Sequence, residues 1–165
     1  MKTDHSASTI KILLITFTLT ALASCHADQS PMDATKLRDL ATRYTAAWCS
    51  QKAASVAAFF TEKGSLRINE GAASVGRTAV AAAAQGFMTA FPDMVVKMDS
   101  LKVGGNRIVY HWTLTGTNTG SGGTGNAVRI SGYEEWIFGA DGLISASLGH
   151  FDSAEYQRQL KEGAR

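Results

Sequence analysis

The stretch TAVAAAAQGFMTAFPDMVVKMDSLKV, residues 78–103, changes its hydrophobic period at Pro92 and so decides the fold. Before the proline, apolar side chains recur at helical spacing, with Phe87 and Phe91 on one side of a helix predicted over 78–91. Pro92 ends that helix, because proline disfavours helical backbone in the residue before it. Beyond it the apolar residues alternate, which predicts a strand over 94–103.

The residues before this stretch predict helices, and the residues after it predict strands. A first helix is expected to start at Pro31, with Ser30 as its cap, and to bury Tyr44 and Trp48 one turn apart. The other expected elements are a helix at 52–60, a strand at 65–69, strands at 107–117, 127–138 and 143–151, and a closing helix at 153–160. This order predicts an α+β domain: a cone-shaped barrel of a curved, mostly antiparallel sheet wrapped around three N-terminal helices, plus a short C-terminal helix.

Five glycines lie within residues 116–125, between two predicted strands. No Lys follows a Gly-x-x-x-x-Gly spacing, so this is not a phosphate-binding loop. The composition predicts a long, mobile hairpin loop, with a flap over a pocket mouth as the functional alternative.

The N-terminal segment resembles the signal peptide of a bacterial lipoprotein. Basic residues precede an uncharged apolar run over 12–24, which is shorter than the ~20 residues of a membrane-spanning helix. The run ends in Leu-Ala-Ser-Cys, residues 22–25, as a lipobox does. The resemblance implies cleavage before Cys25, lipidation of Cys25, a tether over 25–31 and a domain over 32–162. The protein is then exported and membrane-anchored through Cys25, on the periplasmic side or the cell surface. An ordinary secretory signal with a chance cysteine is the alternative.

Composition restricts the function classes. With 45% hydrophobic and 18% charged residues and a net charge of +2, the chain is globular and has no basic cluster, so no nucleic-acid partner is expected. No His, Asp or Glu group has metal-ligand spacing, so no metal site is predicted. Besides Cys25 the only cysteine is Cys49, which we interpret as a small buried hydrophobic residue.

One carboxylate is predicted to lie on the apolar face of the strand over 127–138. Strand alternation puts Glu134 on the same face as Trp136 and other apolar residues. Burial there disfavours the charged carboxylate and raises its pKa, which suits a general acid near neutral pH. The alternative is a structural anchor paired with an arginine or a backbone donor.

A second candidate pair lies at the end of the strand over 143–151. Alternation from Ile144 predicts that His150 and Asp152 share one face, about 6–7 Å apart, at the open end of the cone. Asp152 also begins the sequence Asp-Ser-Ala-Glu, which is a capping box for the closing helix. Catalytic acid and helix cap therefore both remain open for Asp152, and a plain polar rim position remains open for His150.

Several stretches in order resemble the SnoaL-like branch of the nuclear transport factor 2 superfamily, over nearly the whole predicted domain. They are Tyr44–Trp48 running into Val56–Phe60, Gly76–Thr78 leading to Phe91–Asp93, His111–Thr117, Ser131–Trp136 with Asp141–Ile144, and Asp152 before Gln157–Leu160. The resemblance implies a cone-shaped, frequently homodimeric domain without cofactor or metal. It also implies an acid/base Asp late in the sheet, for which Asp152 is the nearest match. Steroid isomerases place their base in the first strand, where this chain has Arg67, Ile68 and Asn69 and no carboxylate.

These observations predict a tethered domain that binds a small, largely apolar molecule and can carry out cofactor-free acid/base chemistry of the cyclase, isomerase or dehydratase type. The predicted catalytic residues are Asp152, His150 and Glu134. The predicted ligand-binding residues are Tyr44, Trp48, Phe87, Phe91, Trp112 and Trp136. The alternative is a non-catalytic binding or dimerisation module, in which aromatic side chains fill the cone.

Overall fold

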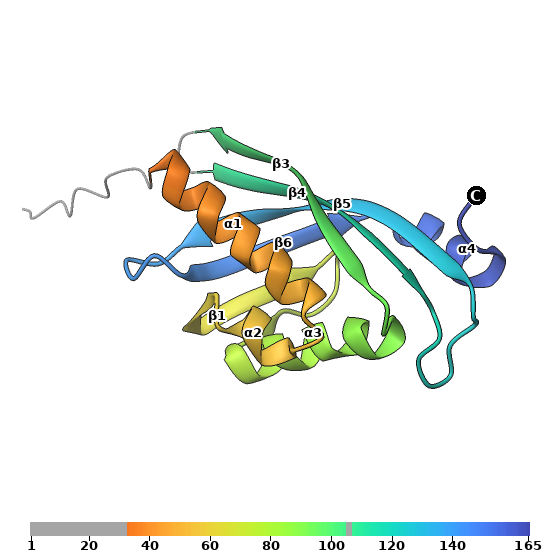
Figure 1. The fold of residues 1–165 in the computed structure, drawn as a ribbon. Helices are drawn as coiled ribbons and strands as arrows, with labels where there is room; N and C mark the ends of the chain where they lie inside the picture. Colours follow the sequence, from red (N-terminus) through yellow and green to blue (C-terminus); the bar gives the residue numbers. More distant parts are fainter. Residues whose placement is uncertain (1–32, 105–106) are drawn as a thin grey trace, which may run out of the picture.

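The computed structural model describes residues 33–104 and 107–165, so the predicted signal segment, the tether and Cys25 lie outside the described residues. The elements in chain order are α1 (Ala34–Cys49), α2 (Ala53–Ala57), β1 (Phe60–Ile68), β2 (Ser74–Val75), α3 (Arg77–Ala90), β3 (Val95–Gly104), β4 (Arg107–Thr117), β5 (Ala127–Phe138), β6 (Ile144–Phe151) and α4 (Ser153–Glu162). Figure 1 shows their arrangement. The predicted α+β class, with three N-terminal helices and a short C-terminal one, is confirmed.

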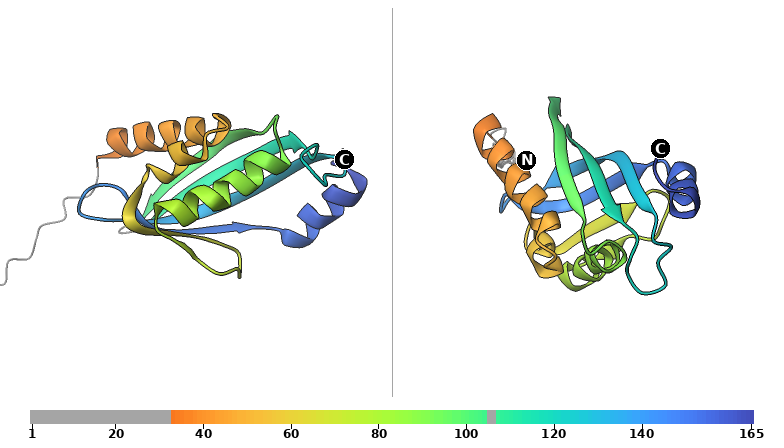
Figure 2. Two further views of the ribbon diagram at one scale, coloured as in Figure 1. Left: turned by 90° about the horizontal axis from the view of Figure 1, so that it is seen from below. Right: turned by 45° about the vertical axis from the view of Figure 1, so that its right-hand side comes forward.

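The described strands form one curved sheet in the order β2-β1-β6-β5-β4-β3. The β1–β6 pair is parallel and every other pair is antiparallel. Because β2 and β3 are free edges, the sheet is open and does not close into a barrel. Helices α1, α2 and α3 lie together against one face, around which the sheet curves (Figure 2). We call this the concave face and the opposite side the outer face.

Helix α1 follows from its sequence pattern, but it starts later than predicted. The Asp33 side chain accepts a hydrogen bond from the Thr35 backbone N–H at 3.1 Å and so caps the helix, a place predicted for Ser30. The buried side of α1 consists of residues at helical spacing, including Tyr44 and Trp48. Helix α3 ends at Ala90, ahead of Pro92, as expected.

Strand β1 is longer than predicted and α2 is shorter. The helix expected over 52–60 ends at Ala57, and Phe60 already pairs with Ile144 of β6. Gly64, which follows that predicted helix, lies inside β1 instead. A Cβ atom there would be 2.7 Å from the Ile144 carbonyl oxygen. Glycine is therefore needed for the close approach of two backbones, a role that does not show in the hydrophobic pattern.

A side-chain amide completes the edge of β5 beyond the end of β6. Gln159 of α4, which is buried, accepts a hydrogen bond from the Arg129 N–H at 2.6 Å and donates one to the Arg129 carbonyl at 2.9 Å. The amide thus replaces the two backbone groups that a neighbouring strand would supply. This contact attaches α4 to the sheet.

The glycine-rich segment contacts the end of α3, a contact that its composition does not predict, and its mobility stays a prediction. Asn118 is buried and donates to the Ala90 carbonyl at 3.1 Å, while its side-chain oxygen accepts from the Thr124 N–H at 2.8 Å. A Cβ atom on Gly120 would lie 1.9 Å from the Thr89 carbonyl oxygen. Because it has no side chain, Gly120 lets the backbone of this segment pack directly against the end of α3.

Candidate functional site

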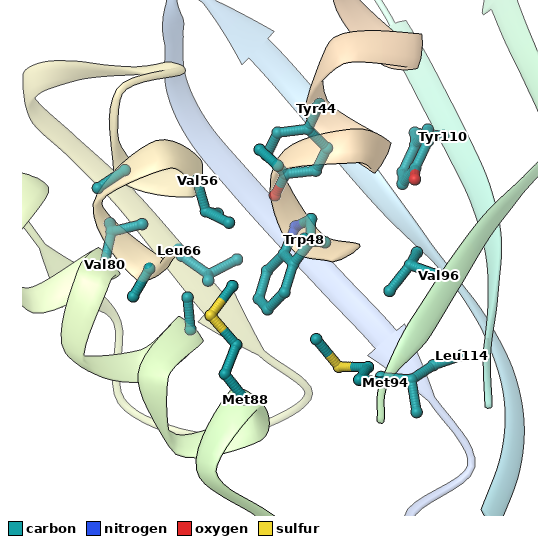
Figure 3. Packing of buried hydrophobic residues seen from close by; sticks show 14 of the residues in the cluster. Tyr44, Trp48, Val56, Leu66, Val80, Met88, Met94, Val96, Tyr110 and Leu114 are labelled. Atoms are coloured by element: carbon teal, nitrogen blue, oxygen red, sulfur yellow. The ribbon is translucent and has the colours of Figure 1, made fainter. Parts of the chain in front are cut away.

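A largely apolar cavity lies between the concave face of the sheet and helices α1 and α3. Its volume is ≈ 50 Å³. The residues lining it are Trp48, Leu66, Ile68, Phe87, Val96, Tyr110, Trp112, Leu114, Glu134, Gly149 and Phe151. Figure 3 shows Trp48 projecting from α1 into the space between Met88 of α3 and the strand residues Val96 and Leu114. One water needs roughly 10–15 Å³ of such space, so the cavity matches a ligand of a few non-hydrogen atoms.

The predicted ligand-binding residues divide into two groups. Trp48, Phe87 and Trp112 line the cavity. Tyr44, Phe91 and Trp136 are at most 1% exposed and belong to the packed core beside it. Tyr44 makes edge-on contact with Trp136, with ring centroids 5.2 Å apart. Aromatic side chains therefore fill part of the cone and leave one small space.

Glu134 is the charged residue of the cavity lining, and three donors hold one of its two oxygens. Its Oε2 accepts hydrogen bonds from the Tyr44 hydroxyl at 3.0 Å, the Trp136 indole N–H at 2.9 Å and the Ser147 hydroxyl at 2.7 Å. These donors come from α1, β5 and β6 and converge on the same carboxyl oxygen. The prediction that Glu134 lies on the concave face is confirmed, and its partners are side-chain donors in place of an arginine.

The other oxygen of Glu134 has a different environment. Oε1 makes no hydrogen bond within the described residues, and it is not among their fully buried atoms that lack a partner. Since Glu134 lines the cavity and Oε2 is occupied by three donors, Oε1 is the oxygen left to accept a further hydrogen bond. Because Oε2 already accepts three hydrogen bonds, the protonated form of this carboxyl has its proton on Oε1.

Burial raises the pKa of Glu134 above its ordinary value, and the hydrogen bonds from Ser147, Trp136 and Tyr44 oppose the rise. Burial and the nearby Glu134 charge also raise the pKa of Tyr44 well above its usual range, so its hydroxyl remains a donor. The Trp48 indole N–H lies close enough to the Tyr44 hydroxyl to offset part of that rise, although its geometry falls short of a hydrogen bond.

His150 and Asp152 do not reach the cavity, because the side-chain alternation of β6 shifts at Ser145. In the pairing of β5 with β6, Phe138 lies opposite Ile144, but its neighbour Ile137 lies opposite Ala146. One step along β5 thus corresponds to two steps along β6, and Ser145 is the extra residue of a β-bulge. After the bulge, Ser147, Gly149 and Phe151 face inward, and the residues between them face outward. The prediction that Ile144 and His150 share a face is wrong for this reason.

His150 lies on the outer face, where its ring stacks on Tyr133 with centroids 4.7 Å apart. Asp152 is exposed, and its side chain accepts from the Glu155 N–H at 2.9 Å, as the N-cap of α4. Of the two alternatives for Asp152, the structure shows the helix cap. The two residues are thus not brought together with Glu134.

Sequence reasoning missed several residues of the site. Ser147 and Gly149 could not be placed because nothing in the hydrophobic pattern marks Ser145 as a bulge. Tyr110 alternates with Trp112 on the bulky side of β4, which is a signal for its position, whereas Phe151 faces inward only because of the bulge; both line the cavity. Within the described ranges, no cluster of His, Cys, Asp or Glu side chains could hold a metal ion. No helix of residues 33–104 and 107–165 is long and apolar enough to cross a membrane.

Comparison with known proteins gives the same fold. The family model of the SnoaL-like domain matches residues 41–147. Among solved structures, a proposed SnoaL-like polyketide cyclase from Jannaschia sp. CCS1 is 18% identical, with 83% of this chain and 99% of that chain covered and a TM-score of 0.69. A proposed polyketide cyclase from Xanthomonas campestris pv. campestris is 19% identical, with 77% and 98% covered and a TM-score of 0.67.

A third similar structure is a protein with a ketosteroid isomerase-like fold from Catenulispora acidiphila DSM 44928, in complex with trimethylamine. It is 13% identical, with 73% of this chain and 91% of that chain covered and a TM-score of 0.65. No curated protein sequence matches this chain.

Proposed function

Since the chain belongs to the SnoaL-like domain family, we propose that its cavity binds a small, largely apolar molecule and that Glu134 exchanges a proton with it. One observation carries this proposal: a buried carboxyl that lines an apolar cavity has one oxygen fixed by three donors and the other without a hydrogen bond among the described residues. The similar protein that holds trimethylamine supports a small molecule as the ligand of such a fold.

The arrangement around Glu134 favours acid/base chemistry over a purely structural role. Three donors keep the carboxyl in one orientation, and burial raises its pKa above the ordinary carboxyl range, which is the direction that favours a general acid. Tyr44, Trp136 and Ser147 also stabilise the anion that remains when Oε1 gives up its proton. Cyclisation, isomerisation and dehydration each proceed by such a proton transfer. Glu134 takes the role that the sequence analysis gave to Asp152.

Filling the cavity from the sheet side tests the proposed binding. Gly149 lines the cavity, and a Cβ atom there makes only ordinary contacts, at 3.4 Å to the Arg67 carbonyl and 3.8 Å to Glu134 Cγ. Gly149→Leu therefore places a side chain in the ligand space. Gly86→Ala is the matched control, because a Cβ atom at Gly86 on the exposed side of α3 meets nothing within 4 Å.

Binding can be measured by saturation-transfer NMR with acetone, tert-butanol and trimethylammonium chloride as probes. We expect at least one probe to bind wild type and the Gly86→Ala variant alike, and to bind the Gly149→Leu variant at least about tenfold more weakly. The proposed binding site is refuted if no probe binds, or if binding is the same in the Gly149→Leu variant.

We also propose that the domain is tethered through a lipid on Cys25 after export. The supporting observation is the apolar run over 12–24 that ends at the lipobox-like residues 22–25, a short distance before the cap of α1. Lipid chains contribute ~0.8 kcal/mol per buried CH₂, so an acylated cysteine holds a protein at a membrane. Fractionation of a bacterium that expresses the full chain tests this. Cys25→Ser should release the protein from the membrane fraction, and equal lipid labelling of the variant and wild type would contradict the tether.

We also propose that two copies of the domain associate through the outer face to form a homodimer. Half-buried Tyr133 and His150 and 55%-exposed Ile137 lie on this face. Sedimentation velocity of wild type and the Ile137→Lys variant tests it. A dimer that dissociates in the variant supports the proposal, whereas a wild type that is monomeric at all concentrations refutes it.

A further inference from the structure

The cavity lining holds one carboxyl group, Glu134, and no described cation faces it to balance its ionised form. Glu134 is 6% exposed, and the side chains that face its carboxyl are Tyr44 from α1, Trp136 from β5 and Ser147 from β6, with Tyr110 of β4 nearby. All four are neutral, and burial keeps both tyrosines protonated by raising their pKa values. No Lys, Arg or His of the described residues lines the cavity. A buried carboxylate without a cation is costly, so a cationic ligand would find a ready partner.

The rest of the lining also suits a cation with an apolar shell. Five aromatic residues line the cavity: Trp48, Phe87, Tyr110, Trp112 and Phe151. The face of an aromatic ring attracts an ammonium group within about 6 Å, and most strongly where water is excluded. Aliphatic side chains such as Leu66 and Val96 supply contacts for alkyl groups.

We propose that the ligand is a small alkylamine, bound as its ammonium ion with the N–H directed to Oε1 of Glu134. This inference rests on the proposed function, since it names the ligand class of the same cavity. A tertiary ammonium has one N–H donor and no acceptor, which matches one carboxyl oxygen that lacks a partner among the described residues. Its few non-hydrogen atoms match a cavity volume of ≈ 50 Å³.

Binding is coupled to the proton of Glu134. When a neutral amine enters, the O–H bond at Oε1 breaks and an N–H bond forms, which leaves an ammonium–carboxylate pair. When the amine enters already protonated, the same pair forms and the proton of Oε1 goes to solvent. Since amines of this class are protonated in water near pH 7, binding should release a proton and become tighter as the pH rises.

One feature of the lining favours a different ligand. The indole N–H of Trp112 is buried and has no hydrogen-bond partner within the described residues, so a neutral molecule with a carbonyl oxygen could accept from it. An unpartnered buried N–H costs about 1–3 kcal/mol, which such a carbonyl would recover. An amine brings its own positive charge to the Glu134 carboxylate and places its alkyl groups against the aromatic lining, whereas a carbonyl compound satisfies only the indole N–H; the amine therefore uses more of the lining, and a carbonyl probe tests the alternative.

Calorimetric titration of the full-length chain between pH 5 and pH 8 distinguishes these ligands. The probes are trimethylammonium chloride, its neutral isostere tert-butanol, and acetone. We expect trimethylammonium to bind most tightly, by at least about tenfold, and its affinity to rise by up to about tenfold per pH unit below the pKa of Glu134. Glu134→Gln should remove both the preference and the pH dependence, and Gly149→Leu should weaken all binding.

Two results overturn the amine proposal. In the first, acetone binds more tightly than trimethylammonium, and its binding weakens as the pH rises. The ligand is then a neutral molecule that accepts a hydrogen bond from protonated Glu134, and the proposed function still stands. Failure of all three probes overturns the proposed function as well. Because the pH dependence is measured in wild type, the test holds even where the Glu134→Gln variant does not fold.

Discussion

Glu134→Gln should change how the stability of the protein depends on pH. In the folded chain, burial raises the pKa of Glu134, whereas an unfolded glutamate titrates near ~4.3. Between these two values the folded state binds one more proton than the unfolded state. The stability that Glu134 contributes is therefore fully present below about pH 4.3 and is lost as the pH rises through its folded pKa.

The magnitude follows from the proton count. One extra proton in the folded state lowers the free energy of unfolding by about 1.4 kcal/mol for each pH unit in this interval. Glutamine has the same shape and can turn its oxygen to the three donors, so the Glu134→Gln variant should fold and lack this slope. In Glu134→Ala, by contrast, Tyr44, Trp136 and Ser147 lose their acceptor, at about 1–3 kcal/mol for each donor left unpartnered.

Urea denaturation followed by circular dichroism at pH 4–8 measures the difference. The free energy of unfolding of wild type minus that of the Glu134→Gln variant should fall with pH and then level off at the folded pKa of Glu134. Other titrating groups are common to both proteins and cancel. If the two stabilities run parallel across this pH range, Glu134 has an ordinary pKa and the account of its burial is wrong.

Three further substitutions test the fold around the site. Asp152→Ala should cost ~0.5–2 kcal/mol of stability and Asp152→Asn much less, with probe affinity unchanged in both, as calorimetry and urea denaturation will show for a helix cap. Gln159→Leu should cost about 1–3 kcal/mol, because both backbone groups of a β5 residue lose their partner, whereas exposed Gln157→Leu should cost little in the same assay. Gly120→Ala should lower the thermal unfolding midpoint, since its Cβ atom would meet a carbonyl oxygen at 1.9 Å, and an unchanged midpoint would contradict the docked loop.

The periodicity of the sequence predicts most of the fold, because buried apolar residues recur about every 3.6 residues in a helix and every 2 residues in a strand. It places Tyr44 and Trp48 on the buried side of α1, and Glu134 with Trp136 on the concave face of β5. A rule of strict alternation is valid only while the pairing register is constant. In β5 the register is unbroken from Ala127 to Ile137, and there the prediction is confirmed.

The failures have local causes that apolar patterns do not encode. The extra residue Ser145 reverses which side chains of the rest of β6 face inward. Ser147 therefore donates to Glu134 and Gly149 lines the cavity, where His150 was expected. The role of Gly64 depends on how closely a distant backbone approaches it. The docking of the glycine-rich segment likewise depends on Asn118, whose side chain finds its partner at the end of α3. These contacts join segments far apart in the chain, and a single sequence does not show them.

The carboxyl carbon of Glu134 reports most directly on the central claim, that a titrating carboxyl faces a ligand cavity. Carbon-13 NMR of glutamate-labelled protein can follow this resonance through a pH titration, free and with saturating trimethylammonium, in wild type and in the Gly149→Leu variant. In the free wild type we predict a pKa of Glu134 above the ordinary carboxyl range. This pKa should fall when trimethylammonium binds. In the Gly149→Leu variant, trimethylammonium should leave the pKa unchanged. An ordinary pKa that no probe changes would contradict the account.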